Sequence, residues 1–209
     1  METKMQKDYF VVIDNHCMLL LEYLTYITLL NVDKYLEPYT EQQEINWQKS
    51  KKIVVYKNMA QLCSFIKNAK ERKNAGKKIY FGRIKHEVAE RIKKATSYNV
   101  EGYNCALYSD NIRKIYKDHG DEQCEGLRGQ RAIKDTDFFR IPEIISKPEL
   151  IENAGLYNKN PVIHFKKDGI TIVGIIADGS LDLYTQTMYI NKKRSLATAI
   201  DERASINTP

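Results

Sequence analysis

The stretch of sequence that decides the fold is Pro161-Val-Ile-His-Phe-Lys-Lys-Asp-Gly-Ile-Thr-Ile-Val-Gly-Ile-Ile-Ala-Asp-Gly-Ser-Leu-Asp-Leu-Tyr-Thr-Gln-Thr-Met-Tyr-Ile-Asn191. It contains three β-rich segments, 161–167, 170–177 and 181–191, joined by Asp168-Gly169 and by Asp178-Gly179-Ser180. An Asp-Gly pair between two such segments is the strongest short-range signal of a β-hairpin. The sequence therefore predicts a three-stranded antiparallel meander.

Side chains on the last predicted strand should alternate between its two faces. Regular alternation divides them into a polar set, Thr185, Thr187, Tyr189 and Asn191, and a mostly apolar set, Tyr184, Met188 and Ile190. The basic residues Lys192 and Lys193 follow directly. The strand is therefore expected to present one polar face.

Helical periodicity precedes the predicted sheet. Apolar residues recur at helical spacing over 58–74 and 84–95, and a third helix is expected over 110–118. Gly120 follows this third helix, where glycine suits the left-handed position that ends a helix. We expect residues 77–209 to form an α+β domain, with helices packed on one side of a small antiparallel sheet.

Residues 1–76 are expected to form a separate, mainly helical N-terminal lobe of unassigned role. Segments 9–13 and 53–56 look like short strands, and the apolar segment 17–30 looks like a buried helix. This segment is shorter than the about twenty apolar residues that span a membrane, and it lacks the basic start of a signal peptide. We expect no membrane association and a place of action in the cytoplasm of a bacterial host.

The charge of the chain is uneven. The formal net charge is +6 and the isoelectric point is about 9.0. Residues 1–46 hold three lysines against eight acidic residues, whereas residues 67–94 hold eleven basic residues against three acidic ones. A basic run attracts polyanions such as RNA, although such runs are also common on ordinary solvated helix faces.

Cysteine spacing argues against a metal centre. Cysteines stand at positions 17, 63, 105 and 124, with no C-x-x-C pair and no histidine at a zinc-type offset. We expect neither a structural metal nor a cofactor, and we expect all four thiols to be structural.

Short motifs follow one another in a distinctive order. They are Ile112-Arg-Lys-Ile-Tyr-Lys-Asp-His119-Gly, Gly129-Gln-Arg-Ala-Ile133, Asp137-Phe, Ile141-Pro-Glu-Ile-Ile145, Lys166 and Thr187-Met-Tyr189. The ordered set resembles the phage-type nucleases of the Barnase–EndoU–Colicin–RelE (BECR) group, which occur as stand-alone phage proteins and at the C-termini of phage-head toxin polypeptides. The resemblance covers roughly residues 78–194. Many of these relatives have a histidine where this chain has Lys114.

The resemblance implies metal-independent RNA cleavage, in which the ribose 2′-hydroxyl attacks its own phosphate and leaves a 2′,3′-cyclic end. It makes His119 the first candidate for the general acid or base, and Thr187 and Tyr189 candidates for donating hydrogen bonds to the phosphate. The candidates for charge stabilisation are Lys114, Lys166 and Arg131. His164 shares a strand face with Lys166 and so could face the same cleft. Each of these residues also has an ordinary structural alternative, as a helix cap, a strand former or a surface cation.

The expected partner is RNA, with tRNA, ribosome-bound message and free RNA all open. The cations expected to bind it are Lys85, Arg91, Lys94, Lys192 and Lys193. Because Lys114 replaces a histidine, a second function class stays open: a catalytically inactive nuclease-like scaffold that binds nucleic acid or a host protein, as a phage inhibitor would. A third is neutralisation of a toxin by protein–protein contact. The first two differ in whether cyclic phosphate ends are produced.

Overall fold

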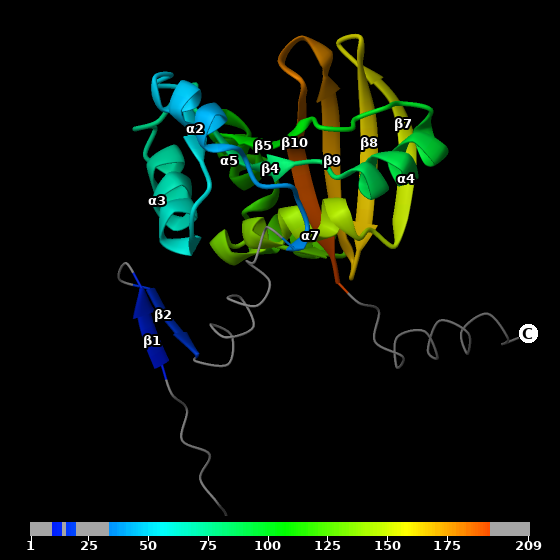
Figure 1. The fold of residues 1–209 in the computed structure, drawn as a ribbon. Helices are drawn as coiled ribbons and strands as arrows, with labels where there is room; N and C mark the ends of the chain where they lie inside the picture. The colour runs from blue at the N-terminus through cyan, green and yellow to red at the C-terminus, as the bar shows by residue number, and fades with distance from the viewer. Residues whose placement is uncertain (1–9, 14–15, 20–33, 193–209) are drawn as a thin grey trace, which may run out of the picture.

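The computed structural model describes residues 10–13, 16–19 and 34–192 (Figure 1). Its first elements are β1 (Phe10–Ile13), β2 (His16–Leu19), α2 (Glu41–Gln48), β3 (Ile53–Val55), α3 (Met59–Lys70), β4 (Lys78–Arg83), α4 (His86–Thr96), β5 (Asn104–Tyr108) and α5 (Ser109–His119). They are followed by α6 (Glu122–Leu127), β6 (Gln130–Arg131), the 3₁₀ helix η2 (Asp135–Arg140), α7 (Ile141–Ser146), β7 (Leu150–Tyr157), β8 (Asn160–Lys167), β9 (Ile170–Ala177), the 3₁₀ helix η3 (Asp178–Ser180) and β10 (Asp182–Asn191). The α+β class is confirmed.

One eight-stranded sheet organises the molecule. Its order is β3-β4-β5-β10-β9-β8-β7, and β6 pairs with the end of β10. The predicted meander is confirmed as β8, β9 and β10, which pair antiparallel. Asp168 and Gly169, which connect β8 to β9, both have positive φ, at 51° and 78°. That backbone is what a two-residue type I′ turn requires.

The sheet is larger and more mixed than the sequence predicts. The edge strand β7 and the internal strand β5 are additions, and β5 pairs parallel with β10. The β7 side chains are mostly exposed, so the strand has no apolar alternation to reveal it. Strand β5 is a short buried run next to a helix, and parallel partners are far apart in sequence.

A β-bulge in β10 changes which side chains share a face. Thr185 pairs with Gly174 and Thr187 with Val173, so the register shifts by one residue between them. The predicted common face of Thr185 and Thr187 is therefore wrong: Thr185 is buried on the same side as Met188. Tyr184 instead joins Thr187 and Tyr189 on the opposite, half-buried side. Bulges re-aim side chains in this way, often near active sites.

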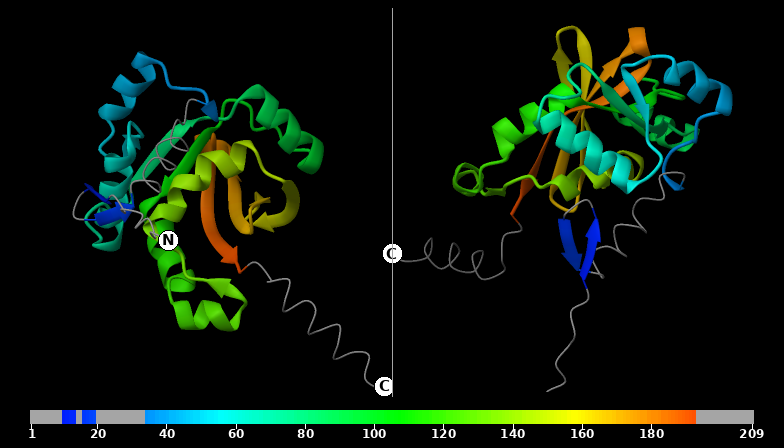
Figure 2. Two further views of the ribbon diagram at one scale, coloured as in Figure 1. Left: turned by 90° about the horizontal axis from the view of Figure 1, so that it is seen from below. Right: turned by 90° about the vertical axis from the view of Figure 1, so that its left-hand side faces the viewer.

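The two faces of the sheet have different surroundings. The core face carries apolar residues of β4, β5, β8, β9 and β10, such as Ile79, Leu107 and Phe165, and it shares one hydrophobic cluster with helices α3, α4, α5 and α7. The opposite face, called the site face below, carries Tyr80, Tyr108, Tyr184, Thr187, Tyr189, His164 and Lys166. Seen from below, α4 lies on one side of the curved sheet, and the α5–α6 segment reaches toward the other (Figure 2, left).

Elements on both sides of the predicted boundary near residue 77 belong to the same sheet and the same hydrophobic cluster. Strand β3 pairs with β4, and Leu62 and Phe65 of α3 belong to the same cluster as Ile79. Whether residues 77–209 form a unit that folds alone stays a prediction. The helix predicted over 17–30 is wrong at 17–19, which pair with β1 as part of β2, and its remainder lies outside the described residues.

Gly120 ends α5 for a steric reason that differs from the predicted one. Its φ is −95°, so the expected left-handed conformation is wrong. A Cβ at this position would lie 2.3 Å from the carbonyl oxygen of Tyr116. Glycine is therefore required by the close approach of the backbone, which turns the chain directly after His119.

None of the described helices has the length and apolar character to cross a membrane.

Candidate active site

A buried carboxylate positions His119 at the end of α5. The imidazole Nδ1 lies 3.0 Å from Oε2 of Glu125, whose side chain is fully buried. The guanidinium of Arg128 donates to the other oxygen of Glu125 at 2.7 Å. Because a carboxylate only accepts hydrogen bonds, Nδ1 carries the proton, and Nε2 is the nitrogen that can exchange a proton with a substrate.

Local sequence builds this pair. After the turn at Gly120, Asp121 caps α6 by accepting a hydrogen bond from the backbone of Cys124 at 2.7 Å. Helix α6 then places Glu125 back against His119. The backbone N–H of Ile133 donates to the carbonyl of His119 at 2.8 Å and closes the loop. The imidazole is consequently held by the helix end, the buried carboxylate and the returning chain.

His119 lies next to Tyr189 of β10. Their ring centroids are 5.9 Å apart and the planes are inclined by 34°. Strand β5 pairs with residues 182–185 of β10 and β6 pairs with residues 190–191, so neither strand pairs with residues 186–189. Helix α5 packs against β10, and Asn111 donates a side-chain hydrogen bond to the carbonyl of Thr185 at 2.8 Å. This contact fastens the helix that carries His119 to the strand that carries Tyr189.

Thr187 is the second strand residue of the predicted site. It follows the bulge and lies on the same face as Tyr189. Its Oγ1 is buried and has no hydrogen-bond partner within the described part of the chain. Buried polar atoms are normally paired, so the Thr187 hydroxyl is free to donate a hydrogen bond to a bound ligand.

Lys166 and His164 of β8 lie on the same face, farther from His119. Tyr189 pairs with Thr171, which pairs with Lys166, so the backbones of Tyr189 and Lys166 are about 10 Å apart. The Lys166 ammonium contacts Glu152 of β7 at 2.6 Å. Burial, and after it the Lys166 charge, lower the pKa of His164. Lys166, His164 and Glu152 therefore lie together on the site face, at a distance from His119.

Lys114 and Arg131 are the two remaining candidates for charge stabilisation. Lys114 is exposed on α5, and a five-residue offset places it about 140° around the helix from His119. Arg131 makes a two-pronged contact with Asp137, at 2.6 and 2.9 Å. Its guanidinium is thereby engaged in holding η2 to β6.

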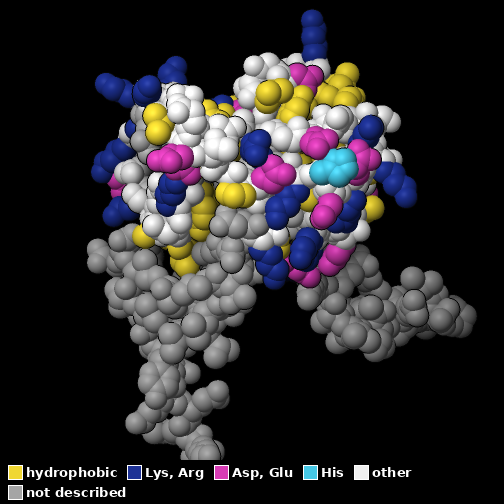
Figure 3. All heavy atoms as spheres, viewed as in Figure 1, with side chains coloured by type: hydrophobic (Ala, Val, Ile, Leu, Met, Phe, Trp, Pro, Cys, Tyr) yellow, Lys and Arg dark blue, Asp and Glu magenta, His cyan; other side chains and the backbone are white. Residues whose placement is uncertain are grey.

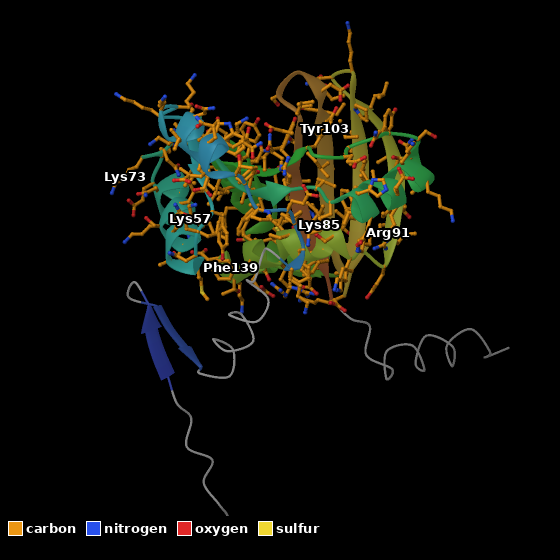
Figure 4. All side chains as sticks on the ribbon, in the orientation of Figure 1. Lys57, Lys73, Lys85, Arg91, Tyr103 and Phe139 are labelled. Carbon is orange, nitrogen blue, oxygen red and sulfur yellow. The ribbon has the colours of Figure 1, made fainter. Side chains whose placement is uncertain are left out.

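The basic run over residues 67–94 extends across two sides of the molecule. Lys73, just after the end of α3, and Arg91 of α4 lie at opposite sides of the view (Figure 4). Basic and acidic side chains are interspersed on the face shown in Figure 3. Arg91 donates to the carbonyls of Ser146 and Pro148, at 3.3 and 2.8 Å. It therefore anchors α4 to the segment before β7.

The other predicted RNA-binding cations lie at α4 and after the end of β10. Lys85 is half-buried at the start of α4, where it donates to the carbonyl of Lys34 at 3.3 Å. Lys94 is exposed beside a shallow surface depression formed with Glu90, Arg91 and Lys93. Lys192 lies 3.8 Å from Glu122 of α6, and Lys193 lies outside the described residues.

No cluster of three or more His, Cys, Asp or Glu side chains suited to a metal ion occurs in residues 10–13, 16–19 and 34–192.

Comparison with known families finds a match. The family described as phage-Barnase-EndoU-ColicinE5/D-RelE like nuclease 3 matches residues 82–198, more than half of the chain. The chain belongs to this family. The match contains α5, α6 and all strands of the site from β5 to β10, and it supports a nuclease-like function. No curated protein and no solved structure matches the chain.

Glu125 is the residue of the site that the sequence does not reveal. It stands six positions after His119 in a segment without apolar periodicity, and nothing in the pattern marks it as buried. The only available signal is Asp121, a typical N-cap residue that predicts a short helix in this place. The contact itself depends on the turn at Gly120.

Proposed function

We propose that the protein is a metal-independent endoribonuclease that cleaves RNA by attack of the 2′-hydroxyl on the adjacent phosphate. The observation that carries the proposal is His119, held by the buried Glu125 and placed against Tyr189 within a nuclease-family fold. A carboxylate-oriented imidazole at the edge of a rigid sheet is suited to transferring a proton at a bound substrate.

The reaction needs two proton transfers. The 2′-oxygen forms a bond to phosphorus as its proton leaves, and the bond from phosphorus to the 5′-oxygen breaks as that oxygen gains a proton. Nε2 of His119 carries one of these transfers. Thr187 and Tyr189 donate hydrogen bonds to the non-bridging oxygens, and Lys166 supplies positive charge from across the sheet. The products are a 2′,3′-cyclic phosphate and a 5′-hydroxyl.

The test is incubation of the purified protein with total bacterial RNA in excess chelator, with the fragment ends mapped. Wild type is expected to produce cyclic phosphate ends, and His119→Ala is expected to lose at least about 10²-fold of the rate, the contribution of a positioned acid or base. His86→Ala is the matched control, because His86 also lies 3.0 Å from a glutamate, Glu101, but on the exposed surface of α4. Equal rates for wild type and His119→Ala would refute the assignment of His119.

The cut sites would identify the substrate among tRNA, message and free RNA. If folded wild-type protein binds RNA without producing cyclic ends, the inactive binding scaffold is the better description. In that case its affinity should fall steeply with salt, because phosphate contacts release counterions. An absence of RNA affinity at any salt concentration would favour a protein partner.

A further inference from the structure

A cluster of tyrosines lies on the site face at the opposite end of β10 from His119. Tyr108 of β5 and Tyr184 of β10 meet edge to face, with ring centroids 5.1 Å apart. Tyr157, at the end of β7, is 48% exposed. Strand register puts Tyr157 on the same face: it pairs with Asn160, which is two residues before Val162 on β8, and Val162 pairs with the Ile175 that also pairs with Tyr184. Burial, and after it Tyr157, raise the pKa of Tyr184. The three rings are called the tyrosine cluster below.

Tyr108, against which Tyr184 packs, is held in place by contacts within the protein. The hydroxyl of Tyr108 donates to the fully buried Asp182 at 2.8 Å, and the ammonium of Lys78 contacts the same carboxylate oxygen at 2.7 Å. Lys78 also lies 5.3 Å from the centre of the Tyr108 ring. Pre-set aromatic rings lose little conformational entropy on binding, which favours their use as contact surfaces.

The bulge in β10 aligns the tyrosine cluster with the candidate active site. Without it, Tyr184 would point to the face opposite Tyr189. Tyr184 pairs with Ile175 and Tyr189 with Thr171, a separation of four residues on β9 or about 13 Å. If a polynucleotide runs along β10 with its reacting phosphate at His119, a neighbouring nucleotide therefore reaches the tyrosine cluster.

We propose that the tyrosine cluster is a nucleobase-binding subsite, in which Tyr184 and Tyr157 stack on a base of the single-stranded RNA whose reacting phosphate lies at His119. The inference rests on the proposed ribonuclease function. Every base has a π-face, so such a subsite confers affinity for unpaired RNA with little base preference. A base held in a double helix cannot enter it.

The variants that test the proposal are Tyr184→Leu, which removes the ring but keeps an apolar side chain, and Tyr184→Phe, which keeps the ring. Tyr157→Leu is the companion variant, because an exposed side chain can be changed without unfolding the protein. The probe is a short fluorescent oligoribonucleotide of mixed sequence with 2′-O-methyl groups, which cannot undergo 2′-hydroxyl attack. Binding is measured by fluorescence anisotropy at several salt concentrations.

Tyr184→Leu and Tyr157→Leu are each expected to raise Kd by about 5- to 150-fold, the range for loss of one base–aromatic stack. Tyr184→Phe is expected to match wild type. The slope of log Kd against log salt is expected to be the same in all four proteins, because no phosphate contact is removed. Unchanged affinity in both leucine variants, or failure of wild type to bind the probe, would overturn the subsite.

Cleavage of unmodified RNA separates this proposal from the proposed function. If wild type binds the probe through Tyr184 but yields no cyclic ends, the subsite stands and the ribonuclease assignment fails. If wild type cleaves RNA and the leucine variants bind and cleave as well as wild type, the ribonuclease assignment stands and the subsite fails.

Discussion

Replacing Asp182 by asparagine is expected to destabilise the protein strongly. The Asp182 side chain is fully buried where β4, β5 and β10 meet. It accepts hydrogen bonds from Lys78 at 2.7 Å, Tyr108 at 2.8 Å and Asn104 at 3.1 Å. The asparagine variant keeps the shape but leaves the Lys78 ammonium without a counter-charge, in a side chain that is only 15% exposed.

The expected cost follows from that burial. Removing one partner of a buried ion pair destabilises by about 3–5 kcal/mol, and we expect the lower end because Lys78 retains some contact with solvent. A loss of about 3 kcal/mol corresponds to a fall in Tm of about 6–12 °C for a chain of this size. Urea denaturation followed by circular dichroism measures the change in the free energy of unfolding.

A double-mutant cycle makes this prediction specific. Lys78→Met alone should also destabilise, since it leaves a buried carboxylate unpaired. The combined Lys78→Met, Asp182→Asn variant should lose less than the sum of the two single losses. Glu71→Gln serves as a control, because its partner Lys73 is exposed and the denaturation midpoint should stay unchanged. A cost below about 1 kcal/mol for Asp182→Asn, or strict additivity in the cycle, would refute the reasoning.

Three further predictions concern the candidate site. Glu125→Gln should reduce RNA cleavage by about 10²-fold or more and alter the pH–rate profile, because a neutral amide can either accept from or donate to Nδ1 and so neither fixes the tautomer of His119 nor stabilises its protonated form; a folded variant with the wild-type profile would contradict the positioning role. Gly120→Ala should cost about 1–3 kcal/mol in urea denaturation, since its Cβ would meet the Tyr116 carbonyl; an unchanged midpoint would contradict the close approach. His164 should titrate below 6.5 by NMR, because burial and Lys166 lower its pKa. Because His164 binds a proton more readily in the unfolded chain than in the folded one, its contribution to the free energy of unfolding is present above pH about 6.5. This contribution is lost as the pH falls toward the pKa of His164 in the folded protein. A His164 pKa at or above 6.5 would contradict it.

Local signals predicted much of this fold. The Asp168-Gly169 turn and the β-branched segments around it predicted β8, β9 and β10, because hairpins form between neighbours in the sequence. Apolar spacing predicted α3, α4 and α5 for a similar reason, since helical contacts are local. The edge strand β7 escaped prediction because its side chains are mostly exposed.

The site was only partly predictable. His119, Thr187 and Tyr189 were named from the motif order, and the structure brings His119 to Tyr189. Lys114 and Arg131 were named in the same way, but helix geometry turns one away and an ion pair with Asp137 engages the other. A motif specifies which residues are present, whereas their approach depends on contacts made across the fold.

By itself, the sequence determined the class of fold, the three-stranded meander and the helix that ends at His119. Only the tertiary structure decided that Glu125 is buried against His119, that β5 pairs parallel with β10, and that a bulge turns Tyr184 onto the face of Tyr189. The physical reason is the range of the interactions. Turns and periodicity are set by adjacent residues, while burial and strand register are set by partners that are distant in the chain.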